Sequence, residues 1–209
     1  MSSSAKSKSW MRAHVRDPYV QQAKKSGYRS RAAYKLIEIA ARDRLLHAGL
    51  AVVDLGAAPG SWSQVLAGRI GPAGRVVAVD LLEVAPISGV TVIRGDFRDA
   101  AVLGQVEAAL GRVRLDLVVS DMAPNLSGVS ATDQARSVHL CELALDFARA
   151  HLKPDGAFLV KVFQGAGYPA FLAAMRSAFV SVASRKPGAS RGRSSEMYLL
   201  GRRLKPESA

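Results

Sequence analysis

From residue 51 onward, short apolar runs rich in β-branched residues alternate with longer amphipathic runs. The apolar runs predict strands at 51–55, 75–80, 90–95, 115–121, 157–163, 179–184 and 197–201. Because these runs are almost continuously apolar, the strands should be buried on both faces, as in a parallel sheet. The amphipathic runs predict helices at 31–46, 60–70, 100–111, 132–152 and 168–178. The alternation predicts an α/β fold, a doubly wound and mostly parallel sheet with helices on both faces.

The two ends of the chain depart from this pattern. No helical run separates the predicted strands 179–184 and 197–201, so the sheet should finish in a hairpin with one antiparallel strand near the C-terminus. Residues 17–31 carry turn signals and aromatic residues rather than the pattern of an amphipathic helix. No internal repeat or linker divides the chain, and its 209 residues, 49% of them hydrophobic, fit one well-packed domain.

The net charge of +12 is concentrated at the ends of the chain. Residues 1–31 hold eight Lys or Arg and one acid, residues 185–209 hold seven and two, and the stretch between them is neutral. A basic excess at both ends of a neutral middle favours a polyanionic partner, most often nucleic acid. Basic ends that only keep a small domain soluble are the alternative.

The cysteine content and the hydropathy of the chain indicate the cellular compartment in which it works. A single cysteine, Cys141, excludes a disulfide framework and a cysteine-based zinc site, and it fits a reducing compartment. No run of about 18 apolar residues is present, so no membrane span is expected. The serine-rich, basic start also fits an organelle transit peptide. It runs without a linker into the predicted helix 31–46, which favours a cytoplasmic chain with a basic RNA-binding extension at 1–31 and one domain at 32–209.

Charged side chains end several of the predicted strands. They are Asp54, Asp80, Asp121 and Lys161, and Asp96 lies just beyond the strand 90–95. In doubly wound sheets, ligands bind at the carboxyl ends of the strands, so these side chains should meet in one crevice. Strand-end acids can also cap helices, but four carboxylates converging without a ligand would repel one another.

The loops after the first three strands indicate which ligand this crevice holds. In DLGAAPGSW, Gly56 and Gly60 permit a tight turn, but the spacing is neither the dinucleotide fingerprint nor a phosphate loop. Asp80 ends the next strand, where an acid suits the two hydroxyls of a ribose. Asp96 and Phe97 offer a hydrogen bond and an apolar contact to an adenine. An adenosine ligand without phosphates indicates S-adenosylmethionine, although a glycine-rich turn alone is common.

Lys161 is the most unusual single residue, because it lies within the otherwise apolar strand AFLVKVF. Buried lysines are rare unless they are paired or functional. The residue is therefore a candidate general base or orienting group, since a desolvated lysine readily loses its proton. A lysine that reaches solvent from the strand end is the alternative.

Seven stretches together resemble the FtsJ family of ribosomal RNA large subunit methyltransferases. They are SRAAYKLIEI (30–39), VVDLGAAPGSWSQVL (52–66), VVAVDLL (76–82), RGDFRD (94–99), DLVVSDMAPNLSG (116–128), LVKVFQG (159–165) and RSSEMYLL (193–200). The resemblance covers about residues 8–201, and it implies a Rossmann-like methyltransferase domain over 32–209. It also implies 2′-O methylation, with S-adenosyl-L-methionine, of a uridine in the A loop of large-subunit rRNA, on the assembled large subunit.

The resemblance also assigns roles to single residues. The cofactor-binding positions correspond to Gly60, Trp62, Asp80, Asp96 and Asp121, and the catalytic tetrad to Lys35, Asp121, Lys161 and Glu196. Taken alone, Lys35 would be interpreted as a surface lysine paired with Glu38, one helical turn on. The expected protein is a monomer that needs no metal and partners the large ribosomal subunit. Two alternatives are a 2′-O-methyltransferase of transfer RNA or of an RNA cap, and a non-catalytic RNA-binding factor for ribosome assembly.

Overall fold

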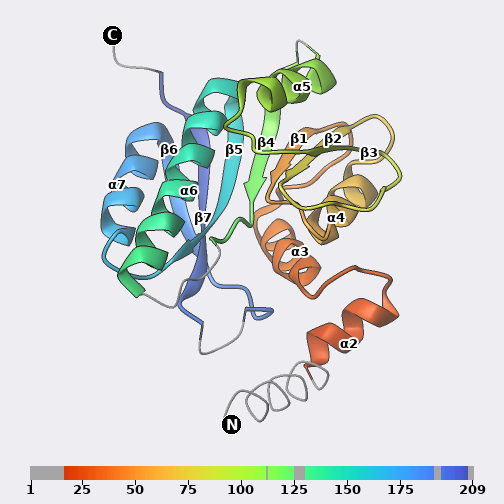
Figure 1. Ribbon diagram of the computed structural model, residues 1–209, viewed down its shortest axis with the longest axis horizontal. Coiled ribbons are helices and arrows are strands. Elements are labelled where there is room, and N and C mark those ends of the chain that lie inside the picture. Colours follow the sequence, from red (N-terminus) through yellow and green to blue (C-terminus); the bar gives the residue numbers. More distant parts are fainter. Residues whose placement is uncertain (1–16, 112, 125–129, 191–193, 207–209) are drawn as a thin grey trace.

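The computed structural model describes residues 17–111, 113–124, 130–190 and 194–206, and it has one seven-stranded sheet. The strands lie side by side in the order β3-β2-β1-β4-β5-β7-β6 (Figure 1). They are β1 (Ala51–Leu55), β2 (Arg75–Asp80), β3 (Val90–Arg94), β4 (Leu115–Ser120), β5 (Leu152–Phe163), β6 (Phe179–Arg185) and β7 (Glu196–Leu204). The order reverses between β1 and β4, which is where ligands bind in sheets of this kind.

The predicted hairpin is confirmed, and β7 is the strand that runs against the others. It pairs antiparallel with β5 on one side and with β6 on the other, whereas the pairs among β1 to β5 are parallel. The register places Glu196 opposite Phe163 and Tyr198 opposite Lys161. Because β7 is reversed, its first residues lie at the edge of the sheet where the parallel strands end.

Helices cover both faces of the sheet, as predicted (Figure 1). The helices α3 (Ala32–Asp43) and α4 (Ser61–Ile70) pack on one face, against Val52, Val76 and Leu159. The helices α5 (Ala100–Leu110), α6 (Ser130–His151) and α7 (Tyr168–Ala178) pack on the other, against neighbours such as Val53 and Val77. Adjacent residues of one strand thus enter different cores, which explains the continuous apolar runs.

The prediction of turns over 17–31 is wrong for its first part, which forms helix α2 (Pro18–Lys25). Asp17 caps this helix by accepting a hydrogen bond from the Tyr19 backbone N–H at 3.0 Å. Proline at the first helical position and two lysines in the last turn are also favourable there. These signals are readable in the sequence, but the Asp-Pro and Ser-Gly pairs of the same stretch also signal turns.

Arg29 joins the segment between α2 and α3 to the loops that follow β1 and β2. Its guanidinium donates hydrogen bonds to the carbonyl oxygens of Pro59, Ala85 and Pro86, at 2.8 to 2.9 Å. The backbone N–H of Arg29 also donates to the side chain of Gln64, at 2.9 Å. The boundary near residue 31 between a basic extension and a catalytic domain therefore stays a prediction, with residues on its N-terminal side already packed on the domain.

The remaining points concern the start of one strand and the search for membrane-spanning helices and metal sites. Strand β5 begins at Leu152 rather than at 157, because Leu152 pairs with Leu115 beyond an irregularity in the register. Within the described segments, no helix is long and apolar enough to cross a membrane. The same segments contain no group of three or more His, Cys, Asp or Glu side chains placed to hold a metal ion.

Candidate active site

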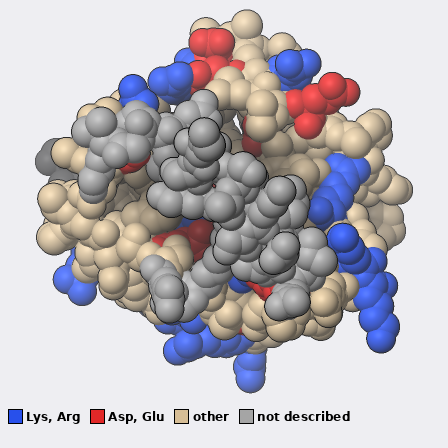
Figure 2. All heavy atoms as spheres, turned by 60° about the horizontal axis from the view of Figure 1, so that its bottom comes forward, with Lys and Arg blue, Asp and Glu red and all other residues tan. Residues whose placement is uncertain are grey.

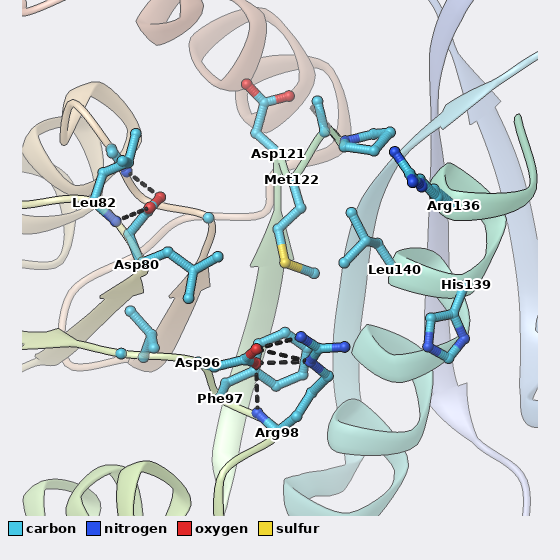
Figure 3. A pocket seen from close by; sticks show the side chains of 17 residues that line it. Asp80, Leu82, Asp96, Phe97, Arg98, Asp121, Met122, Arg136, His139 and Leu140 are labelled. Atoms are coloured by element: carbon cyan, nitrogen blue, oxygen red, sulfur yellow. Dashed lines mark hydrogen bonds and ion pairs between the residues drawn. The ribbon is translucent and has the colours of Figure 1, made fainter. Parts of the chain in front are cut away.

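A pocket of about 580 Å³ opens at the carboxyl ends of β1, β2, β3 and β4 (Figure 3). Its walls come from the loops that follow these strands and from one side of α6. The lining residues are Gly56, Ala58, Val79, Asp80, Leu81, Leu82, Gly95, Asp96, Phe97, Arg98, Asp121, Met122, Ala123, Pro124, Arg136, His139 and Leu140. Three of the predicted site residues, Asp80, Asp96 and Asp121, are therefore brought together here.

Asp80 is fixed at the wall of this pocket by the backbone on either side of it. One carboxylate oxygen accepts a hydrogen bond from the Ala58 N–H and the other from the Leu82 N–H, each at 2.8 Å. A carboxylate oxygen can accept more than one hydrogen bond, so both oxygens keep capacity for a ligand. Asp80 is thus a rigid acceptor whose position depends on two neighbouring loops.

Asp96 lines the same pocket as Asp80 and is paired with Arg98 (Figure 3). The Arg98 guanidinium contacts both carboxylate oxygens, and this hydrogen-bonded cation lowers the pKa of Asp96. The Arg98 side chain is 51% exposed, so water screens the pair and its net contribution to stability is small. Asp96 therefore stays ionised, and Phe97 beside it adds an apolar surface to the pocket.

Asp54 lies beneath the pocket and is completely buried. Its Oδ2 accepts a hydrogen bond from Ser63 Oγ at 2.6 Å, while Oδ1 has no hydrogen-bond partner within the described chain. Burial, with a smaller contribution from the carboxylates of Asp121 and Asp80, raises the pKa of Asp54 to about 7 against the opposing effect of the Ser63 hydrogen bond. The environment of Asp54 thus favours its neutral form more than that of an exposed carboxyl does.

Lys161 is buried beside the pocket, with 7% of its side chain exposed. Its Nζ donates a hydrogen bond to the backbone oxygen of Asp121 at 2.6 Å and lies 3.2 Å from Asp121 Oδ1. The side chain is paired rather than extended to solvent, which excludes the alternative of a solvent-reaching lysine. Asp121 belongs to the pocket as well, so it joins the pocket to the lysine.

Lys35 and Glu196 form a second ion pair at this edge, at 2.7 Å between Nζ and Oε1. Each side chain is only 13% exposed. Lys35 therefore does not pair with Glu38, although its helical spacing alone predicted that pair. The β7 strand brings Glu196 to the first turn of α3, a juxtaposition that spacing along one helix cannot reveal.

Tyr198 joins these two ion pairs, and the sequence analysis missed it. Its hydroxyl donates a hydrogen bond to Asp121 Oδ1 at 2.8 Å, and the Lys35 Nζ lies 5.8 Å from the centre of its ring. Burial raises the pKa of Tyr198 well above its ordinary value, as do the nearby carboxylates of Asp121 and Glu196. A tyrosine within the apolar strand MYLLG was a readable signal, because a buried hydroxyl needs a partner. We call Lys35, Asp121, Lys161, Glu196 and Tyr198 the lysine cluster.

Gly60 and Trp62, the other two predicted cofactor positions, do not line the pocket. Gly60 precedes α4 with a φ of 101°, and a Cβ at this position would meet Arg29, Ile87 and Val84. Trp62 is buried in the core, and its indole N–H donates to the backbone oxygen of Ala32 at 2.8 Å. The cofactor-binding roles of Gly60 and Trp62 therefore stay predictions.

The two basic ends meet beside the lysine cluster, but several of their cations are engaged within the chain. Arg31 donates to the backbone oxygen of Ala189 and pairs with Asp17, while Arg185 pairs with Asp43 at 2.5 Å. Figure 2 shows Lys and Arg side chains at several places around the rim of this face, with acidic side chains among them. Six basic residues of the two ends, Lys6, Lys8, Arg12, Arg16, Arg191 and Arg193, lie outside the described residues.

Comparison with solved structures agrees with this architecture. A ribosomal RNA methyltransferase, putative, from Plasmodium falciparum superposes with a TM-score of 0.75 at 27% identity, covering 85% of this chain and 98% of that one. Human methyltransferase-like protein 13, crystallised with S-adenosylhomocysteine, shares the fold at a TM-score of 0.58 and 18% identity, with 82% of each chain covered. The predicted methyltransferase fold is confirmed.

Relatives by sequence are closer. The Ribosomal RNA large subunit methyltransferase E of Azoarcus sp. is 62% identical over 93% of this chain and 95% of its own length. The protein of the same name from Dechloromonas aromatica is 61% identical over 95% and 97% of the two chains. The model of the FtsJ-like methyltransferase family matches residues 28–204, which include the pocket and the whole lysine cluster. The resemblance inferred from the motifs is therefore confirmed, and the chain belongs to the FtsJ-like methyltransferase family.

Proposed function

We propose that this chain transfers a methyl group from S-adenosyl-L-methionine to the 2′-hydroxyl of a uridine in the A loop of large-subunit rRNA, within the assembled large subunit. The observation that carries the proposal is the juxtaposition of a nucleoside-sized pocket and a buried lysine through one shared residue, Asp121. The names of the two bacterial relatives support rRNA of the large subunit as the substrate class.

The residues of the pocket fit an adenosine-containing cofactor. Asp80 offers two anchored oxygens to ribose hydroxyls, and Asp96 with Phe97 offers an acceptor and an aromatic face to an adenine. When bound, the cofactor supplies a methyl group made electrophilic by the sulfonium. The chain's own residues must then hold the two reactants in line and take up a proton.

The lysine cluster supports a role for Lys161 as the proton acceptor. A ribose hydroxyl is a very weak acid, and a positioned base contributes roughly 10²–10⁴-fold to such a step. Lys161 Nζ is held at the pocket by Asp121, so a 2′-hydroxyl brought to that edge would meet it directly. In the proposed step Lys161 acts as the neutral amine, having given up its own proton to solvent. It accepts the proton of the hydroxyl while the ribose oxygen forms a bond to the methyl carbon and displaces the sulfur. Lys35, Glu196 and Tyr198 orient the acceptor and the ribose.

The basic ends support an RNA partner at the same edge. The exposed Lys24 and Lys25 lie on α2, and α2 packs through Ala23 against Tyr34 and Ala189, close to the cluster. Lysines in this position can contact phosphates on either side of a target nucleotide without reading its sequence. RNA would thus be held by its backbone while the target ribose is presented to Lys161.

Transfer of labelled methyl groups tests the proposal. The purified chain is incubated with labelled S-adenosyl-L-methionine and one of three acceptors: large subunits from a strain that lacks this protein, free rRNA, or transfer RNA. Mapping should find one 2′-O-methyl group in the A loop, with assembled subunits as the best acceptor. Methylation of transfer RNA alone would replace the substrate class. Absence of both transfer and cofactor binding would favour a non-catalytic assembly factor.

A further inference from the structure

Glu38 lies one helical turn from Lys35 and holds the segment that precedes β7. Its carboxylate accepts hydrogen bonds from two consecutive backbone N–H groups, that of Gly188 at 2.6 Å and that of Ala189 at 3.1 Å. From helix α2, the hydroxyl of Tyr19 also hydrogen-bonds to Glu38, and this contact contributes to the raised pKa of Tyr19, behind burial. A single half-buried carboxylate thus joins α2, α3 and the segment 188–190.

The same segment contacts the lysine cluster at its next residue. Ser190 is buried, and its hydroxyl donates a hydrogen bond to Glu196 Oε1 at 2.9 Å. That oxygen is the one paired with Lys35 Nζ at 2.7 Å. The path from Glu38 through residues 188–190 therefore ends on the oxygen that fixes Lys35, and it returns to the helix from which it started.

A second contact strengthens this closed path. The Ala189 backbone oxygen accepts a hydrogen bond from Arg31, which precedes α3 and is itself paired with Asp17 before α2. Both backbone groups of Ala189 are thus bound by side chains from the N-terminal region, and Ala189 itself is fully buried. Hydrogen bonds with one charged partner are about twice as strong as neutral ones, so the segment is held firmly.

We propose that Glu38 is a positioning residue for methyl transfer, which acts through residues 188–190 on Glu196 and hence on Lys35. The proposal rests on the function proposed above, in which the Lys35–Glu196 pair orients the reacting groups. Glu38 touches neither the pocket nor Lys161, so its loss should leave cofactor binding unchanged. A displacement of about 1 Å in such an orienting group can cost up to roughly 10²-fold in rate.

Four variants test this: Glu38→Ala, Glu38→Gln, Ser190→Ala and the matched control Glu107→Ala. Glu107 is also a helical glutamate with one side-chain partner, His151, but it lies on α5. Glu38→Ala should lower kcat by roughly 10- to 100-fold with unchanged cofactor affinity. Glu38→Gln keeps a carbonyl oxygen for the two N–H groups and should recover most of the loss. Ser190→Ala should reproduce part of it, and Glu107→Ala should match the parent chain.

The double variant Glu38→Ala/Glu196→Ala decides between positioning and general destabilisation. If Glu38 acts only through Glu196, the double variant should be no slower than Glu196→Ala alone. Losses that multiply, or a Glu38→Ala chain with the parent kcat, would overturn the proposal. If the parent chain itself transfers no methyl group, the proposed function fails instead. Amide exchange then still tests the contact, because Glu38→Ala should speed exchange at Gly188 and Ala189, and unchanged exchange would refute it.

Discussion

The pocket and the lysine cluster lie at the same edge of the sheet, but they are assembled in different ways. The pocket is built from loops that directly follow β1 to β4, and its acids are held by nearby backbone, as Asp80 is by Leu82. The cluster draws Lys35 from α3, Asp121 from the end of β4, and Glu196 and Tyr198 from the reversed strand β7. The pocket therefore follows from the fold alone, whereas the cluster depends on packing between distant parts of the chain.

If the lysine cluster carries out the chemistry and the pocket binds the cofactor, removal of Lys161 should have the largest effect on rate. Lys161→Ala should lower kcat by about 10²–10⁴-fold and spare cofactor affinity, because the loss is confined to the transition state. Lys161→Arg should fail nearly as badly, since arginine keeps its proton at working pH. Single-turnover methyl transfer, with calorimetry for cofactor binding, measures both. A near-normal rate for the arginine variant would replace the general base with an electrostatic role.

Asp54 tests whether a buried acid next to the pocket lowers the free energy of unfolding. A carboxyl with a pKa of about 7 in the folded chain and 3.8 in the unfolded chain binds its proton more tightly when folded. Its contribution to stability is complete below pH 3.8 and is lost as the pH rises from there through 7. Unfolding free energy should thus fall by roughly 1.4 kcal/mol per pH unit in this window, relative to Asp54→Asn. Urea unfolding of both chains at pH 4.5 to 8 gives the difference. A difference that does not change with pH would contradict the raised pKa.

Asp80 tests the binding role assigned to the pocket. Loss of a partner for buried hydroxyls costs about 1–3 kcal/mol, so Asp80→Ala should weaken cofactor binding about 10-fold or more. The lysine cluster is untouched, so kcat at saturating cofactor should change far less than KM. Calorimetry and steady-state kinetics check this, with Asp116→Ala, at the start of β4, as the control acid. An unchanged affinity would move Asp80 out of the cofactor site.

The smallest expected effect concerns the surface around both regions. Lys24→Ala/Lys25→Ala removes two exposed cations of α2 and should weaken RNA binding by a few fold. The dependence of log affinity on log salt should lose a slope of about 1 for each phosphate contact removed. Anisotropy titrations of an A-loop RNA at several salt concentrations measure the slope. A slope equal to that of the parent chain would mean that α2 contacts no phosphate.

Most of the fold was predictable because it rests on local patterns. Near-continuous apolar runs predicted all seven strands, and the missing helical run before β7 predicted the antiparallel pair. Helix α2 was missed although Asp17 and Pro18 can start a helix, because the Asp-Pro and Ser-Gly pairs of this stretch also signal turns. Hydrophobic periodicity predicts the strands and helices that pack on the core, and it predicts short peripheral helices less well.

The site was predictable only in part. Strand-end position placed Asp80, Asp96 and Asp121 in one pocket, and burial made Lys161 conspicuous. Only the family motifs indicated Lys35 and Glu196 as site residues, because their pairing spans the chain and has no local signature. Neither route found Tyr198 or Glu38, whose partners are fixed by the register of β7 and by the segment before it.

The reversed strand β7 also sets the order in which the enzyme can become complete. β7 lies between β5 and β6 in the sheet, although it is made after both. A chain that ends at residue 195 already holds every residue lining the pocket, but it holds neither Glu196 nor Tyr198. The final strand therefore contributes both its place in the sheet and two members of the lysine cluster. A half-made chain lacks part of the cluster that we propose to carry the chemistry, even though it holds every residue of the pocket.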